Sequence, residues 1–291
     1  MVVEYIWNEP SNRRSRWRRI AYGLLWQLYK RTVALPLIVT LDNGRRLIAH
    51  PSFKGASFAI YAEVYDSVHV RFVRSLASGR GAFVDVGANI GLYTLLLCDR
   101  FERTFAYEPD NRAFEMLRQN VCVNQLQERC SVFQLALGDE SRTVLLSEGT
   151  DSDLVSKVVA DSNTPHRRVE MVTLDSQMLL SGPAVIEYVK IDVEGLELSV
   201  LKGMAGLIAE GRIRLIQFER LAETPLEPLL EFFRSRGWIV FCLVDPVTAS
   251  LGDDYVKNAH DLFAVPDSER ARLEGVVRVE QASAAVERPW S

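Results

Sequence analysis

The sequence predicts an α/β fold in which helices cover both faces of a mainly parallel sheet. From residue 81 to residue 266, apolar segments with the length of strands alternate with segments whose apolar residues recur every three or four positions. The first strand, AFVDVG, leads into a glycine-rich turn, and a helix follows Gly91. Apolar strands that are regularly separated by helices are typical of parallel sheets buried on both faces, so we expect one such domain here.

Seven segments have the composition of strands in this sheet. They are residues 82–87, 103–109, 130–138, 185–195, 213–219, 238–244 and 261–266. Helices are predicted after Gly91 and at residues 111–126, 196–204 and 226–237. One interval, residues 139–183, is too long for a simple crossover. Its two alternating stretches predict an inserted strand pair, and the polar loop that joins them, residues 149–166, lies where a lid could form.

Two smaller units precede this domain. In residues 33–80, the pattern predicts a β-hairpin around Asn43-Gly44, because Asn-Gly readily takes the positive φ angles of a tight turn. A helix over residues 59–76 is predicted to follow. Residues 1–32 place five arginines in front of a ten-residue apolar segment, which should be helical but is too short to cross a bilayer.

This basic N-terminal helix leaves two interpretations open. Trp17, Leu24 and Leu28 fall on one face of the helix, so it could lie in a membrane interface. Alternatively, the helix packs against the domain and its arginines face solvent. In both cases the chain divides into a basic helix (1–32), a hairpin and helix cap (33–80), the main domain (81–266, with the insertion 139–183), and a polar tail (267–291) that we expect to be a marginal helix or disordered.

The composition is that of a globular protein in a reducing compartment. A net charge of −4 gives none of the basic character of a general nucleic-acid binder, so no nucleic-acid partner is expected. The four cysteines form neither a C-x-x-C pair nor a cluster with histidine, which favours free buried thiols over zinc or disulfides. We therefore expect a cytoplasmic protein whose N-terminal helix is its candidate for peripheral membrane contact, and the sequence leaves the oligomeric state open.

The glycine-rich turn, DVGANIG, indicates a nucleotide-type ligand. Glu108 ends the second strand 21 residues after Gly87, which is about the distance at which an acid meets a ribose diol in such folds. Pyrophosphate binders use G-x-G-x-x-G, whereas this loop reads G-x-x-x-G and follows Asp85, whose carboxylate would repel a pyrophosphate. An acid at this position suits a ligand with an ammonium group, such as S-adenosylmethionine, better than a nicotinamide dinucleotide.

Two acids mark a place for chemistry at the end of the fourth strand. Asp192 and Glu194 in IDVEG would lie on the same side of an extended chain, one serving as a base with a raised pKa and the other orienting the substrate. The alternatives are a helix cap and a divalent metal site that includes Glu219, although no metal is favoured. His260 is a secondary candidate for the base, because the start of an antiparallel last strand would lie on the same edge of the sheet. The other histidines, expected at the surface or in packing, are His50, His69 and His166.

Four stretches of the sequence together resemble one known family. DVGANIGLYT, YEPDNRAFEMLRQNV, VTLDS and YVKIDVEGLELSVLKGM have the order and spacing of the FkbM-type S-adenosylmethionine-dependent methyltransferases, over residues 81–266. The resemblance implies the class I methyltransferase fold, which is Rossmann-like, with a seven-stranded sheet whose last strand runs antiparallel. It also implies O-methylation of a hydroxyl on a sugar, a glycolipid or a polyketide-type natural product, with S-adenosylhomocysteine as the second product.

The resemblance also assigns cofactor-binding roles. Carried over position by position, it places Glu108 at the ribose of the cofactor and Ala136, Leu137 and Asp139 along the adenine. The residues that it places around the aminoacyl part are Asp85, Gly87, Ala88, Asn89 and Gly91. It does not extend to the N-terminal helix or the C-terminal tail. A cofactor-binding scaffold without turnover, docked through the basic helix, therefore stays open as the alternative function.

Overall fold

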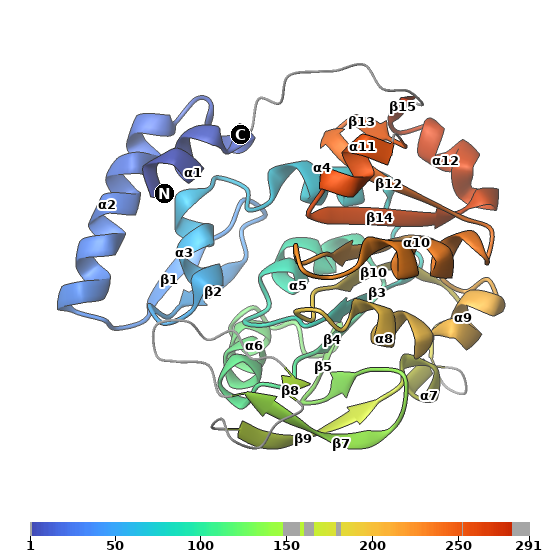
Figure 1. Cartoon of the computed structure of the whole chain (residues 1–291). Coiled ribbons are helices and arrows are strands. Elements are labelled where there is room, and N and C mark those ends of the chain that lie inside the picture. Colours follow the sequence, from blue (N-terminus) through green and yellow to red (C-terminus); the bar gives the residue numbers. More distant parts are fainter. Residues whose placement is uncertain (1, 148–157, 160–165, 179–181, 252, 281–291) are drawn as a thin grey trace.

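The computed structural model describes residues 2–147, 158–159, 166–178, 182–251 and 253–280. A large central sheet carries helices on both faces, and the N-terminal helices and hairpin stand to one side of it (Figure 1). The strands of this sheet are β3 (Ala82–Val86), β4 (Arg103–Tyr107), β5 (Cys130–Phe133), β10 (Ile186–Ile191), β11 (Ile216–Glu219), β12 (Trp238–Asp245), β13 (Thr248–Ser250), β14 (Asp261–Pro266) and β15 (Arg278–Glu280).

The order of the strands is β15-β13-β12-β14-β11-β10-β3-β4-β5. The run from β5 to β11 is parallel throughout, whereas β14 runs antiparallel to both of its neighbours, β11 and β12. The seven predicted strands thus form a mainly parallel sheet whose last strand is antiparallel, and this prediction is confirmed. The short strands β13 and β15 extend the sheet beyond β12, and neither was predicted.

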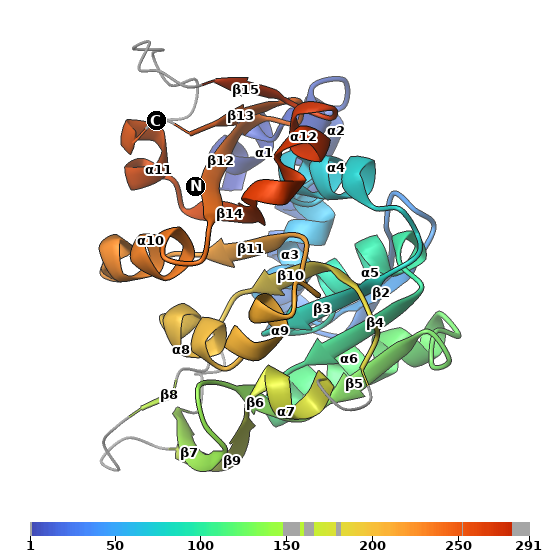
Figure 2. The same ribbon diagram turned by 90° about the vertical axis from the view of Figure 1, so that its right-hand side faces the viewer.

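Helices cover the two faces of the sheet because alternate side chains of each strand point to opposite sides (Figure 2). On β3, Phe83 packs in one core cluster and its neighbours Val84 and Val86 pack in the other. The first cluster includes residues of α4 (Ser67–Leu76), α5 (Leu92–Leu97) and α6 (Asn111–Val123). The second includes residues of α7 (Leu174–Met178), α8 (Glu197–Lys202), α9 (Ala205–Ala209) and α10 (Leu226–Arg234).

The first part of the chain forms a lobe, called here the N-terminal lobe (residues 2–61). Its elements are α1 (Val2–Asn8), η1 (Pro10–Asn12), α2 (Arg16–Thr32), β1 (Leu37–Thr40), β2 (Arg46–Ala49) and α3 (Lys54–Tyr61). The predicted antiparallel hairpin, β1–β2, and the predicted helix before it, α2, are confirmed, although α1 was not predicted. Two side-chain amides hold the hairpin on the main domain: Asn43 donates to the Leu95 carbonyl of α5 at 2.9 Å, and Asn120 of α6 accepts from the Ile48 N–H at 2.7 Å.

The helix predicted at residues 59–76 is instead two helices, α3 and α4. The chain between them is extended at Ala62 and left-handed at Asp66, with φ of 48°. Such a break exposes backbone groups that need partners. Asn12 supplies two of them, because its amide donates to the Tyr61 carbonyl at 2.8 Å and accepts from the Glu63 N–H at 2.9 Å. A residue 49 to 51 positions away thus stabilises the break, which helical periodicity cannot reveal.

The predicted third strand, residues 130–138, is also divided. Its first part is β5, whereas Ala136 and Leu137 form β6, which leaves the central sheet and pairs with β9. The second sheet has the order β6-β9-β7-β8, with bounds Ala136–Leu137, His166–Val172, Arg142–Ser147 and Val158–Val159. Its antiparallel pair β7–β9 confirms the inserted strand pair. Most of the predicted loop at residues 149–166 lies outside the described residues.

The C-terminal segment differs from the polar tail that we predicted. Up to Glu280 it forms η3 (Asp267–Glu269), α12 (Arg270–Glu274) and β15, and it buries Leu273 and Val277. The short helix α11 (Asp253–Asn258) precedes β14. Residues 281–291 of the predicted tail lie outside the described residues.

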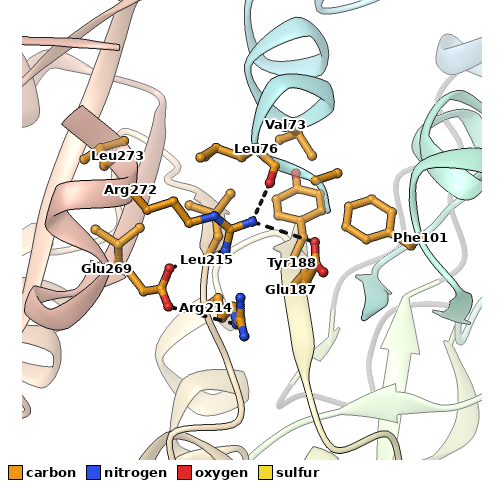
Figure 3. Close-up of a pocket in the computed structure, with 12 residues that line it drawn as sticks. Val73, Leu76, Phe101, Glu187, Tyr188, Arg214, Leu215, Glu269, Arg272 and Leu273 are labelled. Carbon is orange, nitrogen blue, oxygen red and sulfur yellow. Dashed lines mark hydrogen bonds and ion pairs between the residues drawn. The ribbon is translucent and has the colours of Figure 1, made fainter. Parts of the chain in front are cut away.

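Arg272 of α12 fastens this segment to the sheet (Figure 3). Its guanidinium donates to the Leu76 carbonyl at the end of α4, and it lies 3.9 Å from the buried carboxylate of Glu187 and 3.3 Å from Glu269. Glu187 also accepts from the Ser78 N–H at 2.7 Å. The small cavity between these side chains lies at the amino ends of β10 and β11, opposite the predicted site. Because its charged groups are paired with one another, we interpret it as a structural contact.

Candidate active site

The turn after β3 brings the backbone of the loop close to the end of β10. Gly87 has φ of +77°, and a Cβ atom built on it would lie 1.8 Å from the Asp192 carbonyl oxygen. The N–H groups of Gly87 and Ala88 both donate to the Tyr107 carbonyl, at 2.9 and 3.0 Å. Only glycine combines this left-handed conformation with so close an approach. The loop therefore joins the carboxyl ends of β3, β4 and β10 in one place.

Asp85 lies beneath this loop with its side chain almost completely buried. One carboxylate oxygen accepts a hydrogen bond from the Thr94 hydroxyl at 2.6 Å. The other oxygen is buried without a hydrogen-bond partner among the described residues. Burial raises the pKa of Asp85, and the nearby Lys190 ammonium opposes this rise. A buried oxygen that lacks a partner is costly, and it fits the predicted contact with the ammonium group of a cofactor.

Glu108 lies at the end of β4, where a ribose is predicted. Its two carboxylate oxygens accept from backbone N–H groups, one from Asn89 at 2.8 Å and the other from Asp110 at 2.7 Å. Burial raises the pKa of Glu108 to about 7, against the effect of these two hydrogen bonds. These two hydrogen bonds hold the carboxylate in one orientation. Each of its oxygens has a further lone pair, so the carboxylate can still accept hydrogen bonds from a diol.

A cavity lies at these carboxyl ends, and it brings most of the predicted site residues together. The predicted residues that line it are Gly87, Asn89, Glu108, Ala136, Leu137, Asp192 and Glu194. Apolar side chains complete its wall, among them Leu146 of β7 and Leu196. Leu196 directly follows the IDVEG stretch, whereas no sequence motif marks Leu146, because it belongs to the inserted sheet and reaches the cavity only through the fold. The inserted strand pair thus contributes to the cavity, as expected for an element near a lid position.

Four predicted cofactor residues lie outside the lining of this cavity. Asp85 is buried behind the loop, and Ala88 is buried within it. Gly91 starts α5 and packs against Leu117 of α6. Asp139 is exposed and accepts a hydrogen bond from the Ser199 hydroxyl of α8 at 2.9 Å. Ala88 and Gly91 therefore shape the loop, and Asp139 links the second sheet to α8.

The two acids after β10 reach the cavity in a different way from the one predicted. The strand ends at Ile191, and Glu194 has a left-handed φ of 54°, so the alternation of an extended chain does not hold there. Asp192 and Glu194 nevertheless both line the cavity. The N-cap residue of α8 is Leu196, and it is Glu197 that accepts from the Gly195 N–H, at 3.0 Å. These contacts give no support to helix capping as the role of the two acids.

Asp192 belongs to a cluster of charged groups at the ends of β10 and β11. Its carboxylate lies 2.9 Å from the Lys190 ammonium, which is nearly buried and also stands over the ring of Tyr93. Burial alone would raise the pKa of Asp192, but Lys190 and a hydrogen bond from Glu219 hold it below its usual range. Burial and the Asp192 carboxylate raise the pKa of Glu219. Asp192 is therefore ionised and Glu219 is protonated at neutral pH.

This cluster revises one expectation. The raised pKa predicted for a base at the end of the fourth strand belongs to Glu219 on the neighbouring strand, and the pKa of Asp192 is lowered. Within the described residues no three His, Cys, Asp or Glu side chains are grouped as metal ligands would be. Lys190 was not predicted to take part. Its position in an apolar strand, two residues before Asp192 and hence on the same face, is the signal that could have indicated it.

His260 lies at the start of the antiparallel strand β14, on the predicted edge of the sheet. Its Nδ1 atom is 3.2 Å from Glu219 and 3.8 Å from Asp261, and its side chain is 60% exposed. The neighbouring Asp261 carboxylate raises the pKa of His260. Asp261 also accepts from the side-chain amide of Gln217 at 2.9 Å. His260 is thus connected to Asp192 through Glu219, although it does not itself line the cavity.

A buried histidine of α4, His69, belongs to a second charged group near the same edge of the sheet. His69 of α4 lies 2.7 Å from Asp66, whose other oxygen accepts from the Tyr93 hydroxyl. Burial would lower the pKa of His69, but Asp66 and Asp261 raise it to about 9. His69 is therefore a buried imidazolium rather than a simple packing residue. No motif marks it, because its partners come from the break before α4 and from β14.

Because His69 is charged in the folded protein, we expect the free energy of unfolding to fall as the pH rises. A group whose pKa is raised from 6.5 to about 9 on folding stabilises the protein fully below pH 6.5 and loses this effect as the pH passes 9. The contribution is about 3 kcal/mol. Denaturant unfolding at intervals between pH 6 and pH 9.5 should show this loss, and His69→Gln should flatten the slope. An equal slope in both proteins would contradict the assignment.

Comparison with known proteins identifies one family. The family model described as the methyltransferase FkbM domain matches residues 85–238, which is just over half of the chain. The matched segment begins at the buried acid before the glycine loop and ends where β12 begins. It therefore contains the loop, Glu108 and the acids after β10. No curated protein matches the sequence.

Several solved structures are similar to this one. Methyltransferase FkbM from Methylobacillus flagellatus KT is 19% identical, with a TM-score of 0.44, and the match covers 64% of this chain and 44% of that one. The chain thus spans less than half the length of that protein. The N-terminal domain of human METTL16 is 15% identical, with a TM-score of 0.41 and coverage of 85% and 81%. TrmK from M. capricolum, solved with S-adenosylhomocysteine, is 10% identical, with a TM-score of 0.36 and coverage of 68% and 66%.

Proposed function

The chain belongs to the FkbM methyltransferase family, and we propose that it transfers the methyl group of S-adenosylmethionine to a hydroxyl of a sugar, glycolipid or polyketide-type natural product. Methyl transfer from S-adenosylmethionine follows from the family, whereas the hydroxyl acceptor is our proposal. The observation that supports it most is the cavity itself, which Gly87, Glu108 and Asp192 line together. A site for the donor and an ionised acid thus adjoin each other.

The residues present fit the methyl donor. Glu108 suits its ribose diol, and Leu137 and Leu146 offer apolar walls. The unpartnered oxygen of Asp85 suits its ammonium group, although Asp85 lies behind the loop and not in the cavity lining. When bound, the donor supplies an electrophilic methyl group whose departure leaves a neutral thioether. The protein must therefore align the acceptor and exclude water, and it needs no acid for the leaving group.

We assign the proton of the acceptor hydroxyl to Asp192. A base must first be within reach of the proton, and only then does its pKa matter. Asp192 lines the cavity and is kept ionised by Lys190, whereas His260 stands outside the lining. As the new O–CH₃ bond forms, the hydroxyl proton passes to the Asp192 carboxylate. Asp192, whose side chain is 33% exposed at the cavity, can then release this proton to solvent.

Calorimetric titration with S-adenosylhomocysteine tests the donor site. Replacing Glu108 with alanine removes the carboxylate that would hold the diol, so binding should weaken by about 10- to 100-fold. Glu115→Ala, an exposed acid of α6 paired with Arg118, is the matched control and should bind as the wild type does. Equal affinity in the Glu108→Ala protein would remove the ribose assignment.

The acceptor is tested by incubating the protein with labelled donor and representatives of the three proposed classes. Transfer to a hydroxyl of one class, located by mass spectrometry of the product, would support the proposal. Transfer to nitrogen or carbon would overturn it. Tight binding of the donor without transfer to any acceptor would favour the scaffold function instead.

A further inference from the structure

We propose that the N-terminal lobe docks on an anionic lipid bilayer through the outward face of α2 and the adjoining strand β1. This face is called here the docking face and consists of Trp17, Leu24, Leu25, Leu28, Leu35 and Ile38. The proposal concerns a surface on the far side of the lobe and does not depend on the reaction at the cavity.

The apolar side of α2 faces solvent rather than the protein. Trp17 is 75% exposed, Leu24 55% and Leu28 59%, and these are the three residues predicted to share one helical face. The side of α2 that packs inward is the one with Gly23 and Trp26. A helix that merely covered the domain would bury its apolar side. α2 therefore packs on the lobe through Gly23 and Trp26 and leaves its apolar side uncovered.

The apolar surface continues from α2 onto the hairpin. Leu25 and Leu28 of α2 and Ile38 of β1 line one shallow, mainly apolar groove between the two elements. Leu35 and Ile38 are each 61% exposed. Contiguous apolar surface of this kind marks a site of interaction, whereas single exposed apolar residues do not. In Figure 1, α2 stands at the margin of the molecule, where nothing in the described residues covers its outer side.

The charge around this surface selects an anionic partner. Residues 10–41 contain seven arginines and lysines and no acid. Since the whole chain has a net charge of −4, the remaining residues carry −11. Arg13 and Arg14 near the start of α2 and Arg31 at its end are exposed beside the apolar residues. Basic residues that flank an apolar, tryptophan-containing face are typical of helices that lie in the interface of an anionic membrane.

Self-association through the same face is less favourable. A symmetric dimer would place the docking face of one copy against that of the other, and the cationic segments with it. The charges would repel each other, whereas anionic headgroups would neutralise them. Among the described residues, no helix is long and apolar enough to cross a membrane. The docking face therefore suits a peripheral contact in the plane of the interface.

Flotation of the full-length protein with lipid vesicles tests the proposal. The protein should float with phosphatidylcholine vesicles that contain phosphatidylglycerol, and much less with phosphatidylcholine alone, and added salt should weaken the binding. Leu24→Glu combined with Leu28→Glu should reduce flotation by at least about tenfold. Both side chains are exposed, so the variant should fold, and its thermal unfolding should match that of the wild type.

The control is Val247→Glu, which places one of these two negative charges on an apolar residue 62% exposed in the turn between β12 and β13. It should float as the wild type does. Failure of the wild type to bind the anionic vesicles, or equal binding by the double variant, would overturn the proposal. So would light scattering that shows a wild-type dimer and a monomeric double variant, because the face would then be an interface between two copies.

Discussion

Replacement of Asp192 with asparagine is expected to lower kcat by about 10²- to 10⁴-fold, which is the usual contribution of a general base. Asparagine has nearly the same shape but cannot accept the hydroxyl proton. The affinity for S-adenosylhomocysteine should change far less, because the loop and Glu108 remain in place. Steady-state transfer of a labelled methyl group and calorimetry measure the two quantities. Unchanged turnover would remove Asp192 from the chemistry.

Glu219→Gln is the variant that separates the two members of the carboxyl pair. Because Glu219 is protonated beside an ionised Asp192, glutamine preserves both its charge and its ability to donate a hydrogen bond. The Glu219→Gln enzyme should therefore retain much more activity than the Asp192→Asn enzyme. If Glu219→Gln loses more activity than Asp192→Asn, Glu219 accepts the proton and the assignment within the pair is reversed.

The pH profile of kcat/KM distinguishes Asp192 from His260 as the base. The pKa of Asp192 is lowered, so with Asp192 as the base activity should stay constant through neutral pH and fall only in acid. The pKa of His260 is raised above 6.5, so with His260 as the base activity should already decline as the pH falls through the neutral range. A decline there that His260→Gln abolishes would move the role to His260.

The position of the site was predictable because it follows from topology. The carboxyl ends of parallel strands meet at one edge, so Asp85, Glu108 and Asp192 could be brought together although they lie far apart in the sequence. Periodicity and a glycine-rich turn were enough to define those strands. The antiparallel last strand, known only through the family resemblance, placed His260 at the same edge.

What could not be predicted depends on contacts between distant parts of the chain. The break between α3 and α4 is stabilised by Asn12, and the charge of His69 depends on Asp66 and Asp261. None of these pairs leaves a periodic trace in the sequence. The left-handed conformation of Glu194 is of the same kind, because only the folded loop requires it. Local patterns therefore defined the edge of the sheet, and tertiary contacts decided which acid is charged there.

The Gly87→Ala substitution should destabilise the protein by about 3 to 5 kcal/mol and weaken the binding of S-adenosylhomocysteine. The added Cβ atom would meet the Asp192 carbonyl oxygen at 1.8 Å, and a backbone atom cannot move aside as the end of a flexible side chain can. The loop and the end of β10 would have to separate, and the cavity lies between them. The midpoint temperature of thermal unfolding should fall by about 10 °C.

Gly79→Ala distinguishes this contact from the cost of the backbone conformation alone. Gly79 has φ of +78°, nearly that of Gly87, but a Cβ atom on it would have open space around it. Replacing it with alanine should lower the free energy of unfolding by only about 1–2 kcal/mol, which is the cost of alanine in a left-handed conformation. The binding of S-adenosylhomocysteine should stay unchanged. If Gly87→Ala were no more harmful than Gly79→Ala, the loop would tolerate a side chain. The close approach to β10 would then not be what shapes the donor site.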